Sequence, residues 1–160
     1  VGLPMDAMVN TLATFTGLPH RCERVANIGG VDYINDSKGT NLGATVAALE
    51  GLGPGLAGKI ILIAGGVGKG ADFSDLVAPL SRYGKQTLLI GEDAKHIEQA
   101  LAEKVAFSHA KDMQEAVSLA YQQAVSGDLV LLSPACASFD AYSSFEARGD
   151  HFAKLVWALT

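Results

Sequence analysis

The chain contains the stretch IILIAGGVGKG at Ile60–Gly70, which combines an apolar run with a glycine-rich loop. The near-continuous apolar run at Ile60–Ala64 is what a central parallel strand, buried on both faces, requires. The glycines directly after it place a loop at the carboxyl end of that strand, where α/β sheets bind ligands. This stretch therefore predicts an α/β fold with a ligand-binding edge.

The glycine loop departs from two common nucleotide-binding motifs. A Walker A loop needs Gly-Lys followed by Ser or Thr, whereas Gly70 follows Lys69 here. The GxGxxG pattern also fails, because the glycines fall at Gly66, Gly68 and Gly70. Glycines at these positions still let the backbone approach a ligand, to which Lys69 would add a positive charge. The alternative is a flexible turn with a solvated lysine.

A second polar loop lies in the segment YINDSKGTN at Tyr33–Asn41. It reads as the end of a strand, a loop and then a helix over Leu42–Gly51, with Thr40 or Asn41 as the N-cap. The free N–H groups of that helix and the Lys38 ammonium favour an anion at this point. The alternative is a capped surface loop with a solvated lysine.

A third loop follows the apolar strand expected at Gly127–Leu132. Its sequence is SPACASFD at Ser133–Asp140, rich in small residues and hydroxyls. A last helix is predicted over about 140–158, with Ser138 as its cap. Cys136 is interpreted as structural rather than nucleophilic, because no neighbouring base is present to activate it.

The alternation of strands and helices predicts a mostly parallel, Rossmann-like sheet with helices on both faces. An N-terminal hairpin is expected from strands over Arg21–Asn27 and Gly30–Asn35, because glycine between them permits a tight turn. The loops 35–41, 65–72 and 133–139 then share one edge of the sheet. Their lysines and hydroxyls predict a site for carboxylates or phosphates, but they do not choose between the two and supply no general base.

Composition limits the class of protein. A length of 160 residues suits one domain, and 49% hydrophobic against 18% charged residues allows a substantial core. A net charge of -5 without a Lys/Arg cluster argues against nucleic acid as the main partner. No apolar run reaches the roughly 20 residues of a membrane helix. Cys22 and Cys136 lack metal-ligand spacing, which favours two buried thiols.

Three segments carry a resemblance to a known family. They are NDSKGTN at Asn35–Asn41, GGVGKGADF at Gly65–Phe73 and SPACAS at Ser133–Ser138, and GLPHR at Gly17–Arg21 and FEARG at Phe145–Gly149 agree with them. Over about residues 15–160 the sequence resembles the C-terminal domain of the Mur ligases of peptidoglycan synthesis, in the branch that adds D-glutamate. Sister ligases share the fold but carry other residues in the first two loops.

The resemblance implies an enzyme that joins D-glutamate to UDP-MurNAc-L-alanine with cleavage of ATP. A carboxylate is phosphorylated, and the D-glutamate amine attacks the acyl phosphate. The residues implied to hold D-glutamate are Lys38, Thr40, Lys69, Ser138, Phe139 and Phe145. Arg21 and Asp36 are implied to meet the phosphates and ribose of ATP, with His20 alongside. These roles agree with the anion site, since a dianionic amino acid needs two cations plus hydroxyl and N–H donors.

The same resemblance implies a three-domain ligase of the bacterial cytoplasm. Residues 1–18 would be the hinge or last helix of a central ATPase domain, and residues 19–160 the C-terminal domain. The UDP-binding domain and the central domain, which brings the P-loop and the Mg²⁺ ligands, are not in this sequence. We therefore assign no catalytic residue and no metal ligand here, and expect the chain alone to be inactive and to bind ATP weakly.

Two other interpretations stay open at this point. The first is a dinucleotide-binding oxidoreductase domain, which rests on Gly65–Gly70 and on Glu92 as a ribose-binding acid after the next strand. The second is a non-catalytic module that binds small carboxylates.

Overall fold

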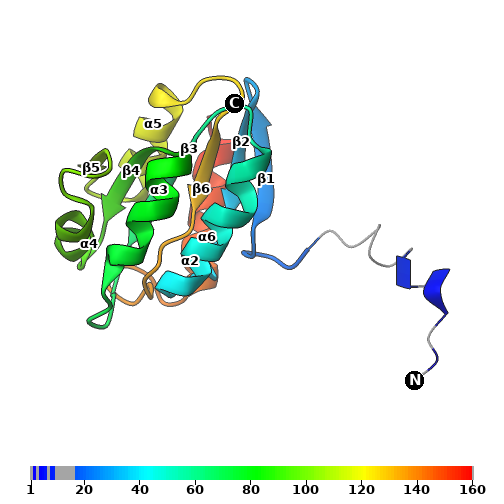
Figure 1. Cartoon of the computed structure of the whole chain (residues 1–160), viewed down its shortest axis with the longest axis horizontal. Coiled ribbons are helices and arrows are strands. Elements are labelled where there is room, and N and C mark those ends of the chain that lie inside the picture. Colours follow the sequence, from blue (N-terminus) through cyan, green and yellow to red (C-terminus); the bar gives the residue numbers. More distant parts are fainter. Residues whose placement is uncertain (1, 3, 7, 10–16, 160) are drawn as a thin grey trace.

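A computed structural model describes residues 2, 4–6, 8–9 and 17–159 of the chain. The predicted interdomain segment, residues 1–18, therefore lies largely outside the described residues. From residue 17 onward the chain forms one sheet with helices packed against it (Figure 1).

The sheet has six strands in the order β1-β2-β6-β3-β4-β5. Every neighbouring pair is parallel except β1 with β2. This confirms the predicted mostly parallel sheet with an N-terminal hairpin. The strands are β1 (Glu23–Ile28), β2 (Val31–Asn35), β3 (Ile60–Gly65), β4 (Gly84–Ile90), β5 (Phe107–His109) and β6 (Leu129–Leu132).

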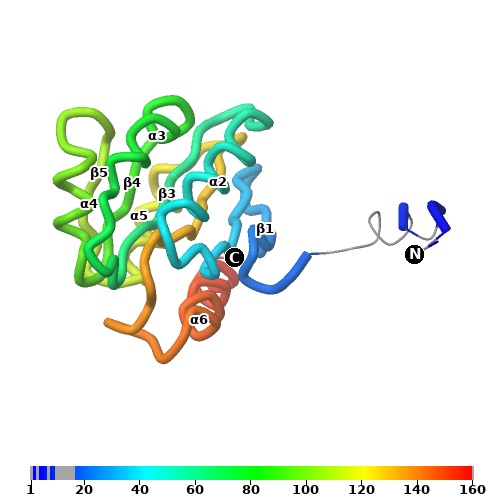
Figure 2. The backbone as a smooth tube through the Cα atoms, turned by 60° about the horizontal axis from the view of Figure 1, so that its bottom comes forward, coloured from blue at the N-terminus to red at the C-terminus, as the bar shows by residue number. Residues whose placement is uncertain are grey.

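Helices cover both faces of the sheet, and β3 shows why. Ile60, Leu62 and Ala64 point to one apolar cluster, and Ile61 and Ile63 point to the other, because successive side chains alternate across a strand. The first cluster is closed by α2 (Leu42–Leu52), the 3₁₀ turn η2 (Phe73–Leu76), α3 (Val77–Tyr83) and α4 (Ala94–Leu101). The second is closed by α5 (Met113–Gln123) and α6 (Phe145–Trp157). Figure 2 shows α6 on the opposite side of the strands from α2 and α3.

The hairpin turns at Gly29 and Gly30, whose φ angles of 59° and 82° suit glycine. Its first strand begins at Glu23, two residues later than predicted. Arg21 and Cys22 form a bend before the strand, with Cys22 at φ 45°. Arg21 is therefore free of the sheet ladder and lies beside the β2 loop. Cys22 is exposed, so the prediction of two buried thiols is wrong for it and right for Cys136.

The last helix begins later than predicted. A short turn forms first, in which Tyr142 N–H donates to Ser138 O at 2.8 Å, and the helix itself starts at Phe145. Its cap is Ser144, whose Oγ accepts from Ala147 N–H at 3.2 Å, and not Ser138. A serine side chain competes for backbone N–H groups in this way, so it ends the turn and begins a new helix.

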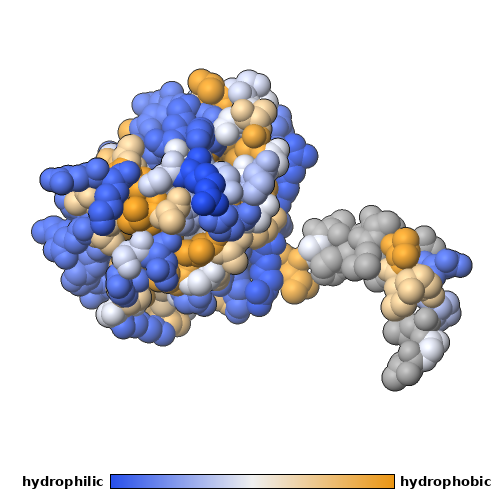
Figure 3. Space-filling view, viewed as in Figure 1, coloured by the Kyte–Doolittle hydropathy of each residue, from blue (hydrophilic) through white to orange (hydrophobic). Residues whose placement is uncertain are grey.

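The surface is mixed in character. On the face shown in Figure 3, hydrophobic residues form small separate areas among hydrophilic ones. In the part of the chain that the structure describes, none of the helices combines the length and the apolar character that crossing a bilayer requires.

Asp128 ties together the sheet edge opposite to the three loops. Its carboxylate is 4% exposed and accepts from Lys85 Nζ at 2.6 Å, Lys59 N–H at 2.8 Å and Val125 N–H at 3.0 Å. Burial alone would raise the pKa of Asp128, but these hydrogen bonds outweigh burial and hold the pKa below its usual value. The ionised carboxylate is therefore a source of stability.

Replacing Asp128 with asparagine is expected to cost about 1–3 kcal/mol of unfolding free energy at pH 7, because all three donors lose a charged acceptor and at least one of them then faces an NH2 group. A depressed folded pKa gives stability above the unfolded value of about 4, and that stability is lost as pH falls through the folded pKa. The deficit of D128N should therefore shrink below about pH 4. Urea titrations at pH 7 and at a pH below about 4 measure the free energy of unfolding of D128N, with the exposed Asp75→Asn as the control. An equal loss of unfolding free energy at the two pH values would contradict the expectation.

Candidate functional site

The three predicted loops meet at the carboxyl ends of the parallel strands. The loop after β6 joins the glycine loop through Gly65 N–H to Pro134 O at 2.9 Å, and Val67 and Ala137 exchange two further backbone bonds. It joins the loop after β2 through Ala135 N–H to Gly39 O at 2.9 Å. The convergence expected from the sequence is confirmed.

Asp36 holds two of these loops together from inside. It is buried, and its carboxylate accepts from Ser133 Oγ at 2.7 Å and from Cys22 N–H at 3.2 Å. Burial raises the pKa of Asp36 above its usual value, although both hydrogen bonds oppose the rise. Gly39 lies so close that a Cβ there would meet Asp36 Oδ2 at 2.6 Å. Asp36 therefore shapes the loop, and its contact with a nucleotide stays a prediction.

Lys38, Phe145 and His20 form one cluster from three separate segments. The Lys38 ammonium lies 3.8 Å from the centre of the Phe145 ring, and Lys38 N–H donates to His20 O at 3.0 Å. The His20 ring meets the same phenyl ring edge-on at 6.0 Å. A cation over an aromatic face is attracted to it, so Phe145 holds the Lys38 ammonium at the loop edge.

Arg21, Asp36 and Lys38 line one open pocket of about 310 Å³, together with the first turns of α2. The helix wall is made of Ala44, Ala47 and Ala48, which leave room beside the cations. The α2 N-cap is Asn41, whose side chain accepts from Ala44 N–H at 3.0 Å. Two cationic side chains beside a helix N-terminus suit an anionic group.

The glycine loop is fixed by an acid that the sequence did not reveal. Asp93, just before α4, accepts from Gly68 N–H at 2.6 Å and contacts His96, while its own N–H donates to Gly66 O. The hydrogen bond from Gly68 lowers the pKa of Asp93, so the acid stays ionised. Lys69 follows at φ 54°, a strained angle for a non-glycine residue, and is exposed.

The remaining predicted residues lie on the same edge. Thr40 is half-buried beside Lys38, Ser138 is buried, and Phe139 is 71% exposed at the rim. The structure brings His20, Lys38 and Phe145 into contact and places Arg21 and Asp36 in their pocket. That Lys69, Thr40, Ser138 and Phe139 close on the same ligand stays a prediction.

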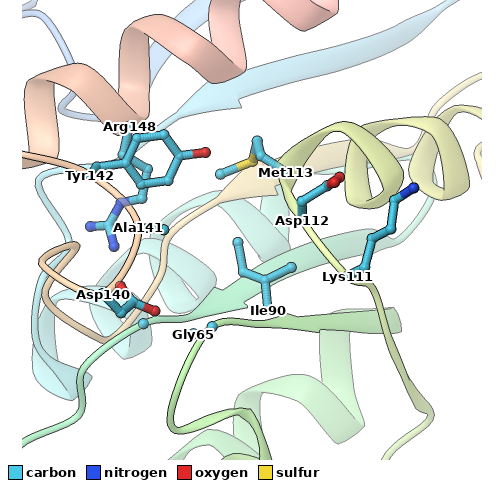
Figure 4. A pocket seen from close by; sticks show the side chains of 11 residues that line it. Gly65, Ile90, Lys111, Asp112, Met113, Asp140, Ala141, Tyr142 and Arg148 are labelled. Atoms are coloured by element: carbon cyan, nitrogen blue, oxygen red, sulfur yellow. The ribbon is translucent and has the colours of Figure 1, made fainter.

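A second pocket, of about 110 Å³, lies beside the ends of β3 and β4 (Figure 4). Arg148, Tyr142 and Asp140 line one side of it. Arg148 is 1% exposed, and sequence reasoning gave it no role. The sequence does contain a signal that Arg148 is buried. The residues on the core-facing stripe of α6 recur at helical spacing, and an arginine is among them: Phe145, Arg148, Phe152 and Val156.

Comparison with known sequences gives one family. The family described as "Mur ligase, glutamate ligase domain" matches residues 20–136. Relatives named UDP-N-acetylmuramoylalanine–D-glutamate ligase include those of Legionella pneumophila (strain Lens), with 52% identity over 158 residues, and Marinobacter nauticus, with 56% over 158. In both cases the match covers 99% of this chain and 35% of the relative. The chain thus spans about a third of the length of these relatives.

Solved structures show the same fold at low identity. A bifunctional folylpolyglutamate synthase/dihydrofolate synthase from Yersinia pestis, complexed with AMPPNP and Mn ion, matches with a TM-score of 0.68 and 21% identity, over 99% of this chain and 35% of that one. A MurF ligase from Thermotoga maritima in complex with ADP matches with a TM-score of 0.66 and 18% identity, over 95% and 34%.

The profile match covers most of the chain, and the matched region contains the loop after β2, the glycine loop and the start of the loop after β6. The fold and the converging loops agree with the family that the sequence identity indicates. The chain belongs to the Mur ligase family, of which it carries the C-terminal, glutamate ligase domain.

Proposed function

We propose that this chain is the amino-acid-binding domain of an ATP-dependent ligase that adds D-glutamate to UDP-MurNAc-L-alanine in peptidoglycan synthesis. The observation that carries the proposal is the meeting of three polar loops at one sheet edge, with the Lys38 ammonium held over Phe145. Identity of 52–56% to ligases of that name, at nearly full coverage of the chain, supports the choice of substrate.

The chemistry of D-glutamate suits this edge. Its two carboxylates would pair with the ammonium groups of Lys38 and Lys69, and Thr40 and Ser138 would donate hydroxyl hydrogen bonds. Phe145 and Phe139 would flank the carbon chain. The domain then contributes position, because it aims a neutral amine at the acyl carbon instead of transferring protons itself.

We expect ATP to contact this domain through its phosphates. Arg21 is exposed and shares the pocket with Lys38, so a forked guanidinium and an ammonium are available to phosphate oxygens, with His20 alongside. Asp36 fits the nucleotide less well, because both its carboxylate oxygens already accept protein hydrogen bonds.

Mg²⁺ fits poorly here as a resident ion. Among the described residues no group of three or more His, Cys, Asp or Glu side chains could hold a metal. As the family resemblance implies, we propose that the metal is bound mainly by a central domain outside this chain. When bound with ATP, Mg²⁺ would neutralise the phosphate charge. The proposed partners are accordingly the remaining domains of a cytoplasmic bacterial ligase.

The dinucleotide-binding oxidoreductase interpretation is not favoured. The family match and the named relatives are ligases. Glu92, the expected ribose-binding acid, is exposed, and its N–H donates to Asp140. A module that only binds carboxylates differs from our proposal in lacking coupling to ATP.

The test is ATP-dependent ligation by the complete polypeptide that carries this chain. We expect ADP release that requires both UDP-MurNAc-L-alanine and D-glutamate and that L-glutamate does not support. We expect no release from the 160-residue chain alone. ADP release independent of D-glutamate would contradict the proposed substrate, and ligation by the isolated chain would contradict its role as a binding domain.

A further inference from the structure

Arg148 connects the loops that carry the predicted ligand-binding side chains. Its guanidinium donates from Nε to Ser37 Oγ at 3.0 Å, from Nη2 to Ser37 O at 2.9 Å and from Nη1 to Cys136 O at 3.1 Å. Ser37 immediately precedes Lys38, and Cys136 stands two residues before Ser138. One side chain on α6 therefore bonds to both loops at once.

The same network reaches Phe145. Ser37 Oγ accepts from Arg148 and donates to Phe145 O at 2.7 Å, which ties the first residue of α6 to the residue before Lys38. The Phe145 ring lies under the Lys38 ammonium at 3.8 Å. Ser37 is itself fully buried, so it cannot exchange these partners for water.

The charge of Arg148 is not used in an ion pair. In residues 17–159 the ion pairs join other side chains, and the three hydrogen bonds of Arg148 go to a hydroxyl and two carbonyl oxygens. Burial lowers the pKa of Arg148 to about 10, so the group stays protonated at neutral pH. The guanidinium spreads five donors over three nitrogens in a rigid plane, so it can hold separate fixed acceptors at set positions, whereas the three donors of an ammonium all leave one nitrogen.

We propose that Arg148 is a positioning residue that sets the spacing between the Lys38 loop and the Ser138 loop, and through it the affinity for the dicarboxylic amino acid. The identity of the ligand, D-glutamate, rests on the proposed function, whereas the hydrogen bonds of Arg148 to the two loops do not depend on it. Arg148 lies beneath the loop edge and is only 1% exposed, although it lines the 110 Å³ pocket, so it offers very little surface to a ligand. It therefore acts through Lys38, Phe145 and Ser138.

The kinetic test uses the complete ligase. Arg148→Lys keeps the charge and loses the fork, so we expect the KM for D-glutamate to rise at least about tenfold while the KM for ATP changes less than about twofold. Val156→Ala is the matched control, because Val156 is fully buried on the same helix but two turns away from the loops. V156A should lower the Tm with an unchanged KM for D-glutamate.

A second variant covers the case in which R148K does not fold. Ser37→Ala keeps the carbonyl acceptor and removes the hydroxyl that links Arg148 to Phe145, so a smaller rise in the same KM is expected, about three- to fivefold. A KM for D-glutamate within about twofold of wild type in the folded variants, or an equal rise in V156A, would overturn the proposal.

A readout without ligand separates this proposal from the proposed function. Amide hydrogen exchange in the 160-residue chain should speed up in both loops, 36–41 and 133–139, in R148K or S37A but not in V156A. If the wild-type ligase does not use D-glutamate but hydrogen exchange speeds up in both loops of R148K or S37A, the proposed function fails and the positioning role stands. If only one loop or neither loosens, the positioning role fails.

Discussion

Replacing Lys38 with methionine is expected to lower kcat/KM for D-glutamate about 100- to 1,000-fold in the complete ligase, which corresponds to about 3–4 kcal/mol of lost binding in the transition state. The reason is the loss of a charge-assisted hydrogen bond to a carboxylate, which leaves one substrate charge unpaired. Methionine keeps an unbranched apolar chain against the Phe145 ring, so the fold should survive.

The control for this experiment is Lys104→Met, because Lys104 is exposed in the turn after α4, away from the three loops. Steady-state kinetics with D-glutamate varied at saturating ATP measure the effect. A K38M enzyme with kcat/KM for D-glutamate within about threefold of K104M would show that Lys38 does not bind the amino acid.

Replacing Gly65 with alanine is expected to destabilise the domain by more than about 4 kcal/mol, at the severe end of single substitutions. Gly65 ends β3 at φ 128°, a region open essentially only to glycine, and a Cβ there would lie 1.8 Å from Ile90 O in the neighbouring strand. Backbone atoms of two central strands would have to move, and the glycine loop would move with them.

A comparison with Gly70→Ala separates the cost of backbone strain from the cost of a steric clash. Gly70 also has a positive φ, 74°, but a Cβ there would meet nothing within 4 Å. We expect a cost of about 1–2 kcal/mol, the penalty of a left-handed conformation alone. Urea denaturation of both variants measures the difference, and equal midpoints would contradict the steric argument.

The sheet was predictable because its signal is local. Ile60–Ala64 has no polar residue, so both faces of that strand had to be covered, and the structure buries every residue of β3. Once the strands are parallel, their following loops must share one edge. The loops 35–41, 65–72 and 133–139 are therefore expected to lie together without any long-range information.

The contacts within the site were not predictable in the same way. Lys38 and Phe145 meet across most of the chain length, and the Arg148 fork joins Ser37 to Cys136 only because α6 packs against β2 and the edge loops. The sequence also placed the start of the last helix too early, since apolar spacing continues through a turn that Ser144 interrupts. Periodicity shows which face is buried, but not which polar groups close a network beneath it.

The most direct test of the D-glutamate site is a titration of the ¹⁵N-labelled 160-residue chain, followed by amide chemical shifts. The account predicts saturable shifts with D-glutamate in all three loops, centred on Lys38, Lys69 and Ser138, and weaker ones with L-glutamate. Saturable shifts confined to another part of the domain, or identical responses to both enantiomers, would contradict it.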